Sequence, residues 1–181
     1  YEARNSNIRV EMRLYDVLAG TMIAGKVYTG VRSNLRPLVH KMANEIVYQF
    51  TGEAGFFNSK IALVSDKTGN KEVYIMDVDG QNMLPITRNR SINLQPSWSP
   101  NGNAVVFTSY RSGNPDLYVA DLDNGRTHRL SSRPGLNTGG AWNPAGNLIA
   151  LTLTVGGDTD IFTIDPYAGK EVAQLTRGNG I

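Results

Sequence analysis

Short apolar segments recur along the chain from residue 61 onward, at a constant spacing of 44 residues. The segments 61–64, 105–108 and 149–152 keep this register, and one extra residue enters late in the third copy. Other residues repeat at the same offset: Gly69, Gly113 and Gly157; Tyr74, Tyr118 and Phe162; Asp77, Asp121 and Asp165; Trp98 and Trp142; Pro100 and Pro144; Gly102 and Gly146. So many matches at one spacing predict an internal structural repeat.

Each copy of the repeat has the pattern of four short strands. In the middle copy we expect strands over 95–99, 104–109, 116–121 and 127–131, separated by turns rich in Asn, Asp and Gly. The second strand is almost wholly apolar, which is typical of a strand buried on both faces. Four strands in about 40–45 residues are typical of a β-propeller blade. A β-sandwich is the alternative, although sandwiches do not usually keep one spacing through three copies.

The copies are too few to close a ring. The first begins at its second strand, near Lys60, so the chain holds about two and three-quarter blades, whereas propellers close with about four to eight. An open arc exposes an edge strand at each end, which invites aggregation. We therefore expect residues 59–181 to be an incomplete propeller with an open ring, taken from a longer, mainly β protein.

Residues 1–58 lie outside the repeat and have a different pattern. Apolar and charged residues alternate from Ile8 to Leu14, which predicts a half-buried strand, and a second strand is expected over 22–28. A helix should follow, with Ser33 as its N-cap, an apolar stripe along one side and Gly52 at its end. A ββα piece buries too little apolar surface to stand alone, so we expect the C-terminal part of a small α/β amino-terminal domain.

Composition excludes several classes of protein. The 18 Lys and Arg residues against 16 Asp and Glu give a net charge of +2, which is too weak to indicate nucleic-acid binding. No apolar run approaches the roughly 20 residues of a membrane span. The chain has no cysteine, which excludes a disulfide scaffold and thiolate metal or redox chemistry.

Little in the chain indicates catalysis or metal binding. The two histidines, His40 and His128, have no serine or carboxylate at a spacing typical of a triad, and we expect both to be surface or structural residues. The pair Asp77/Asp79 and its repeat 44 residues later flank tight turns, where Asp bonds its own backbone. A calcium loop needs more oxygen ligands than these pairs supply. No enzyme activity, cofactor or metal site is predicted.

The two tryptophans, Trp98 and Trp142, could in principle stack on a ligand. They occupy matching positions of the repeat, beside Ser-Pro and Asn-Pro turns. That position favours packing in the core of a blade, where large aromatic side chains contribute most.

Charge is predicted to separate between the two ends of the blades. In a four-stranded antiparallel blade, the loop between the second and third strands and the loop to the next blade lie on one face. These loops and the end of the last copy carry Arg88, Arg90, Arg111, Arg133 and Arg177. The turns of the opposite face carry Asp77, Asp79, Asp121, Asp123 and Asp165. The basic face could serve solubility alone, or it could dock a partner of opposite charge.

Four segments resemble one known family. The strand pair from Ile8 to Gly30 and the helix exit from Tyr48 to Phe57 are similar to the end of the amino-terminal domain of TolB proteins and to their passage into the propeller. The segments Pro96–Gly102 and Ala141–Gly146 are similar to the family's P-x-W-S-P-D-G blades. This blade motif also occurs in other propellers, including those attached to peptidases.

The resemblance implies a function in the cell envelope. It implies a periplasmic, non-catalytic scaffold of the Tol–Pal system, with about six blades in the full protein. It further implies that one propeller face binds the Pal lipoprotein and that a missing amino-terminal segment binds TolA. The protein would then reach membranes only through partners, bind no nucleic acid, and support outer-membrane integrity and cell division. The alternatives are the propeller of a serine peptidase whose catalytic domain is missing, and a generic sugar- or metal-binding propeller.

The resemblance also implies where Pal would bind. The family's contacts lie partly in the loop before the innermost strand of a blade. The positions carried over on that ground are Leu136, Asn137, Thr138 and Gly139, with their equivalents one blade earlier, Ile92, Asn93, Leu94 and Gln95. Arg90 and Arg133 join them from the predicted basic face.

Overall fold

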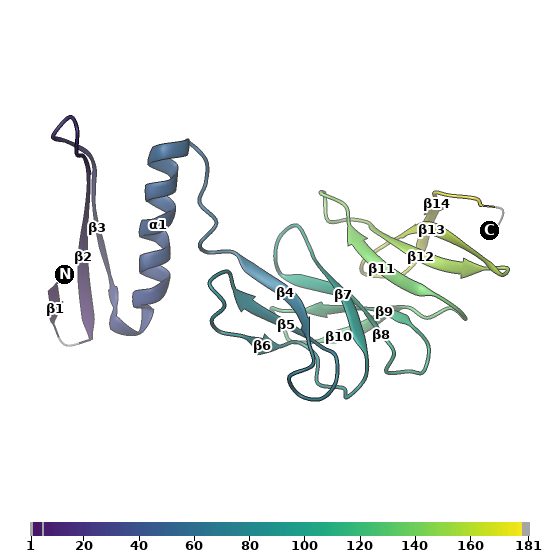
Figure 1. Cartoon of the computed structure of the whole chain (residues 1–181). Coiled ribbons are helices and arrows are strands. Elements are labelled where there is room, and N and C mark those ends of the chain that lie inside the picture. Colours follow the sequence, from purple (N-terminus) through teal and green to yellow (C-terminus); the bar gives the residue numbers. More distant parts are fainter. Residues whose placement is uncertain (1, 5, 179–181) are drawn as a thin grey trace. The chain divides into compact units, whose positions relative to one another are not determined.

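The computed structural model describes residues 2–4 and 6–178, which form two compact units. The first unit holds the residues up to Lys60 together with Asp77–Gln81, and the second holds Ile61–Met76 and the residues from Asn82 onward. A strand pair with a helix makes up most of the first unit, and a succession of small sheets makes up the second (Figure 1). Among the described residues, no helix is long and apolar enough to cross a membrane.

The first unit contains an antiparallel sheet of order β1-β2-β3. Its elements are β1 (Glu2–Arg4), β2 (Asn7–Asp16), β3 (Thr21–Val31), the 3-10 turn η1 (Arg32–Asn34) and α1 (Leu35–Thr51). Alternate positions of β2 are buried, including Ile8 and Met12, because α1 packs on that face of the sheet and buries its own Leu38. The alternation predicted from the sequence is confirmed.

The two ends of α1 differ. Ser33 lies in η1, and no side chain caps the start of the helix, so the predicted Ser33 N-cap is wrong. Gly52 ends the helix with a φ of 72° and donates its N–H to the carbonyl of Tyr48 at 2.9 Å. Glycine fits this left-handed position because it has no Cβ. After it, the chain returns to the helix, where the N–H of Phe57 donates to Asn44 Oδ1 at 2.9 Å.

The second unit is built from three antiparallel sheets, ordered β4-β5-β6, β10-β9-β8-β7 and β11-β12-β13-β14. Their strands are β4 (Lys60–Ser65), β5 (Glu72–Asp77), β6 (Leu84–Pro85), β7 (Asn93–Trp98), β8 (Ala104–Ser109), β9 (Asp116–Asp121), β10 (Thr127–Ser131), β11 (Asn137–Trp142), β12 (Ile149–Val155), β13 (Asp158–Ile164) and β14 (Glu171–Gln174). The predicted fold class, mainly β with four-stranded blades, is confirmed, and the first sheet lacks the innermost strand as expected.

The core lies between successive sheets. Val105 and Phe107 of β8 belong to a cluster with Val73 of the first sheet, whereas Val106 belongs to a cluster with Leu151 of the third. Both faces of β8 are therefore buried, which explains its apolar run from Ala104 to Phe107. Trp98 packs against the first of these clusters and Trp142 against the second, so the prediction that both tryptophans pack in the blade core is confirmed.

Candidate binding face

The predicted contact positions lie at one edge of the sheets of the second unit. In the second sheet, Asn93 at the start of β7 pairs with Ser109, which pairs with Asp116. The third sheet repeats this row 44 residues later, with Asn137, Leu153 and Asp160. The loops at this edge, which we call the loop face, are 66–71, 86–92, 110–115, 132–136 and 156–157.

Ile92 and Leu136 are exposed apolar residues at matching positions of the loop face. Their exposed fractions are 47% and 39%. The carbonyl of Ile92 accepts a hydrogen bond from the N–H of Tyr110 at 2.9 Å. The carbonyl of Leu136 accepts one from the N–H of Thr154 at 3.1 Å, and the Leu136 N–H donates to Thr154 Oγ1 at 3.0 Å. The backbone of Ile92 is thus fixed to the residue that follows β8 and that of Leu136 to β12, while both side chains are exposed.

Asn93 and Asn137 occupy the next position along the chain and are fully buried, with exposed fractions of 0%. Their backbone N–H groups donate to carbonyls of the preceding blade, from Asn93 to Lys71 at 2.8 Å and from Asn137 to Pro115 at 3.0 Å. The idea that these two side chains touch a partner therefore needs correction. Their side-chain amides form hydrogen bonds within the protein and do not reach its surface.

Leu94, Gln95, Thr138 and Gly139 belong to the inner strands rather than to loops. The strand register shifts between Leu94 and Ser97 in one sheet, and at the equivalent place in the other, so each inner strand carries a bulge. Gln95 and Gly139 adopt φ values of 54° and 69° there. Leu94 and Thr138 are half-buried. These four positions shape the edge of the face.

The two arginines predicted to act on the loop face differ in their surroundings. Arg90 is exposed, has a φ of 56° and donates its backbone N–H to Glu72 Oε1 at 2.9 Å. Arg133 forms an ion pair with Glu171 of β14. The pair reduces the positive charge that Arg133 presents. Arg111 lies over the ring of Tyr118, 3.7 Å from its centroid.

Three buried acids share the 44-residue spacing, and the sequence reasoning gave none of them a role in the site. Glu72 and Asp116 begin β5 and β9, Asp160 is the third residue of β13, and all three are at most 7% exposed. Glu72 accepts hydrogen bonds from Arg90 N–H, Thr87 Oγ1 and Asn93 Nδ2. These donors come from the segment that leads to the next blade. The offset that revealed the repeat would have found these acids.

The other two acids bind donors from other segments. Asp116 accepts from Asn114 Nδ2 at 2.8 Å and from Arg129 Nη1 at 3.3 Å. Asp160 accepts from the backbone N–H of Gly178, and this bond, with those from Thr176 and Gln174, lowers the pKa of its carboxyl. Glu72 therefore fixes the loop 86–92, Asp116 contacts the loop 110–115, and Asp160 binds the segment that follows β14.

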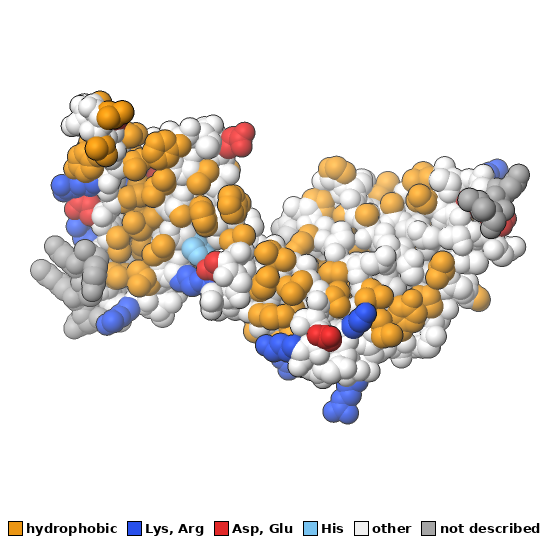
Figure 2. Space-filling view, in the orientation of Figure 1, with side chains coloured by type: hydrophobic (Ala, Val, Ile, Leu, Met, Phe, Trp, Pro, Cys, Tyr) orange, Lys and Arg blue, Asp and Glu red, His pale blue; other side chains and the backbone are white. Residues whose placement is uncertain are grey.

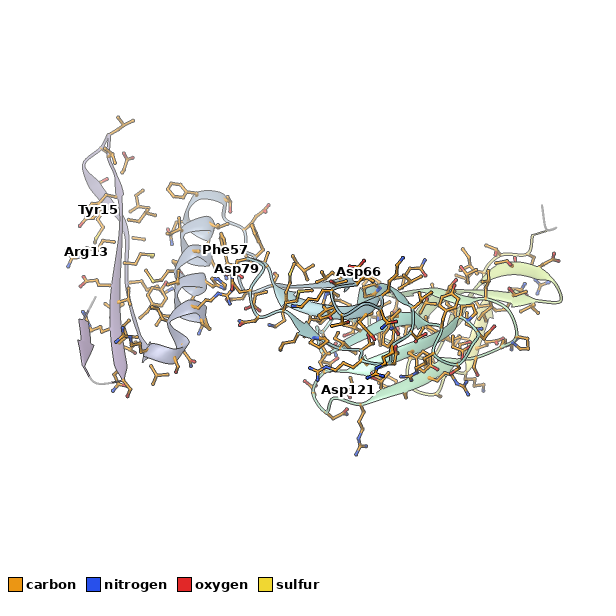
Figure 3. The ribbon with its side chains drawn as sticks, turned by 60° about the horizontal axis from the view of Figure 1, so that its bottom comes forward. Arg13, Tyr15, Phe57, Asp66, Asp79 and Asp121 are labelled. Carbon is orange, nitrogen blue, oxygen red and sulfur yellow. The ribbon has the colours of Figure 1, made fainter. Side chains whose placement is uncertain are left out.

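The opposite edge of the sheets is built from tight turns. Asp121 Oδ1 accepts from the N–H groups of Asp123 and Asn124, at 2.9 and 3.2 Å, and Asp165 Oδ1 likewise binds two N–H groups of its turn. Asp66 of the loop face and Asp121 lie on opposite sides of the unit (Figure 3). The predicted turn role of these acids is confirmed. No group of three or more His, Cys, Asp or Glu side chains within residues 2–4 and 6–178 could hold a metal ion.

Charged groups gather in the first unit around Arg36. This guanidinium binds Asp79 and, at 3.0 Å, Asp77, which also pairs with Lys60 at 2.7 Å. Arg36 is the largest cause of the lowered pKa of Asp79. His40 Nε2 lies 3.2 Å from Asp79 Oδ2, so this histidine has the structural contact that was predicted. Hydrophobic side chains cover much of the visible face of this unit (Figure 2).

Comparison with known proteins gives a consistent result. The family model described as TolB beta propeller domain matches residues 47–181. Two relatives named Tol-Pal system protein TolB are 48% identical over 102 residues, in Geobacter sulfurreducens, and 42% identical over 106 residues, in Syntrophotalea carbinolica. The matches cover 56% and 59% of this chain but 24% and 25% of those proteins. The chain thus spans about a quarter of the length of the curated relatives it matches.

Solved structures share the fold. The crystal structure of TolB from Acinetobacter baumannii has a TM-score of 0.86 and 24% identity, over 96% of this chain and 44% of that one. Dipeptidyl peptidase 4 from Porphyromonas gingivalis has a TM-score of 0.56 and 21% identity, over 65% and 17% of the two chains. Identities this low speak only for the architecture. The family model, however, matches well over half of the sequence, and the chain therefore belongs to the TolB β-propeller family.

Proposed function

We propose that this chain is part of a Tol–Pal system protein, a non-catalytic periplasmic scaffold that binds the Pal lipoprotein through the loop face. The observation that carries the proposal is the 48% identity, over 102 residues, to a relative with that name. In this proposal, residues 1–58 are the C-terminal part of an α/β amino-terminal domain and residues 59–181 are propeller blades. TolA would bind an upstream segment, and the assembly would support outer-membrane integrity and cell division.

The geometry of the loop face supports a role in docking a protein. Ile92 and Leu136 expose apolar side chains. Their own backbones and those of the asparagines that follow them are held by hydrogen bonds to other segments. Arg90 adds an exposed positive charge nearby along the chain. Pre-organised apolar residues with a polar rim are the usual composition of a protein interface, because little conformational freedom is lost on binding.

The surroundings of the two histidines support a scaffold rather than an enzyme. His40 lies against Asp79 in the first unit, and His128 is exposed on β10. The partner of His40 is a carboxylate that also pairs with Arg36, which is the environment of a structural histidine.

The propeller of a serine peptidase is the second candidate, favoured by the shared fold with dipeptidyl peptidase 4. The complete coding sequence separates the two candidates. A signal peptide upstream and about three more 44-residue repeats before a stop would support the scaffold. A downstream G-x-S-x-G domain would identify a peptidase instead.

Pal binding can be tested with the full-length protein. We expect calorimetry with the soluble domain of the cognate Pal to detect binding, and Leu136→Arg to weaken it by about a hundredfold, because a buried apolar contact is replaced by a charge. Arg126→Glu, a charge reversal in the turn between β9 and β10 on the opposite edge, is the control. Equal losses from both variants would contradict binding through the loop face.

A further inference from the structure

The side chain of Asn137 forms hydrogen bonds with the backbone of the loop that precedes it. Its Oδ1 accepts hydrogen bonds from the N–H of Arg133 at 2.9 Å and from Ser131 Oγ at 2.7 Å. Its Nδ2 donates to the carbonyls of Arg133 at 2.7 Å and Gly135 at 3.2 Å. The amide therefore uses its acceptor and its donors within one short loop, and fixes both backbone groups of Arg133.

Asn93 also forms hydrogen bonds with backbone groups, one blade earlier and with different partners. Its Nδ2 donates to the carbonyls of Lys71 and Ser91, at 3.0 and 3.2 Å. It also binds Asn89 Oδ1 at 2.9 Å and the buried carboxylate of Glu72 at 3.0 Å. Since the two loops differ in sequence, the asparagine is the common element that closes both.

The residue directly before each asparagine is the exposed apolar residue of that loop. Ile92 and Leu136 are held on one side by the hydrogen bond from the second strand and on the other by the buried amide. Without the amide, the loop would gain alternative conformations, and a partner would have to order it again on binding. Binding would weaken even though the asparagine touches nothing outside its own unit.

We propose that Asn93 and Asn137 are positioning residues of the partner-binding face, which set the conformation of Ile92 and Leu136. This inference rests on the proposed function, since it names how the same face recognises its partner. It assigns the two asparagines an indirect role and the two apolar residues the direct one.

A double-mutant cycle tests the coupling. In the full-length protein, we expect Asn137→Ala and Leu136→Ala each to weaken binding of the soluble Pal domain by about tenfold, and the double variant to bind no more weakly than Leu136→Ala alone. Val106→Ala, which truncates a fully buried core residue of β8, is the control for lost stability. We expect it to bind as the wild type does.

Each other outcome has a defined meaning. Independent, multiplicative losses in the double variant, or wild-type affinity of Asn137→Ala while Leu136→Ala is weakened, would overturn the positioning role and leave the proposed function standing. A wild-type protein that does not bind Pal would overturn the proposed function itself. If Asn137→Ala does not fold, Asn137→Ser replaces it, because the serine hydroxyl is uncharged and can keep part of the hydrogen bonding to the backbone of Arg133. We expect it to show a smaller loss and the same coupling to Leu136, and additive losses would again overturn the inference.

Discussion

The carboxylate of Asp160 accepts a hydrogen bond from the backbone N–H of Gly178, with 3.0 Å between the two atoms. Gly178 follows β14, so the bond ties the segment that leaves the third sheet to the start of β13. Thr176 Oγ1 and Gln174 Nε2 bind the same carboxylate at 2.9 and 3.0 Å. The charged form of Asp160 therefore has three donors, and its pKa is lowered.

This network predicts how stability depends on pH. Because the pKa of Asp160 is lower in the folded protein than in the unfolded chain, its stabilising contribution is complete above the unfolded pKa of about 3.9 and disappears as the pH falls through the folded value. We expect Asp160→Asn to lower the urea midpoint at pH 6, and the difference from wild type to shrink below about pH 4. The exposed neighbour variant Asp158→Asn is the control. A difference that stays constant down to pH 3 would contradict this assignment.

Gly140 of β11 has no room for a side chain. A Cβ at this position would lie 2.8 Å from Val106 Cγ2 and 2.9 Å from Leu117 Cδ1. We expect Gly140→Ala to destabilise the protein by about 1–3 kcal/mol, as overpacking of a close-packed core does. Val106→Ala should partly offset the loss in the double variant, and the free energy of unfolding from denaturant titration measures both. Strictly additive losses would show that the two residues do not meet.

Sequence periodicity predicted the sheets well because burial on both faces constrains every position of a strand such as β8. Val105 and Phe107 face one neighbouring sheet and Val106 faces the other, so these central positions are apolar, and the buried Thr108 and Ser109 follow only at the end of the strand. The turns were equally readable, because Asp121 binds the backbone of its own turn. Interactions between residues that are close in the chain can therefore be predicted from the sequence.

The candidate face was predicted less well, because its contacts join residues that are distant in the chain. The ion pair between Arg133 and Glu171 joins a loop to a later strand, and no local sequence pattern predicts this contact. Asn137 was assigned as a partner contact because it lies in the loop where the resemblance to TolB proteins places such contacts. Its burial follows from hydrogen bonds to Arg133 that only the folded loop provides.

A substitution of Trp142 can show whether this side chain packs in the core or contacts a partner. The side chain is half-buried against the core cluster between the second and third sheets. We expect Trp142→Ala to lower the free energy of unfolding by about 3 kcal/mol, toward the low end for a buried aromatic, and to leave Pal affinity at 10 °C unchanged. Tyr167→Ala, at an exposed turn position, is the control and should change stability little. A Trp142→Ala protein of normal stability that no longer binds Pal would make the tryptophan a contact residue.

The two arginines of the loop face should respond differently to charge reversal. Arg90 is exposed, whereas Arg133 is already paired with Glu171. We expect Arg90→Glu to weaken Pal binding more than Arg133→Glu does, and the loss to be larger at 20 mM salt than at 300 mM, because exposed charges are screened over about 10 Å at 0.1 M salt and over less at higher salt.

Calorimetry with the full-length protein at both salt concentrations measures the two losses. Arg126→Glu on the opposite edge corrects for the change in net charge. Since the pairing with Glu171 is the reason for the smaller effect at Arg133, the variant Glu171→Gln should raise the affinity for an acidic partner surface slightly, and Arg133→Glu in that background should cost as much as Arg90→Glu. Losses that do not change with salt would mean that the arginines do not act through charge.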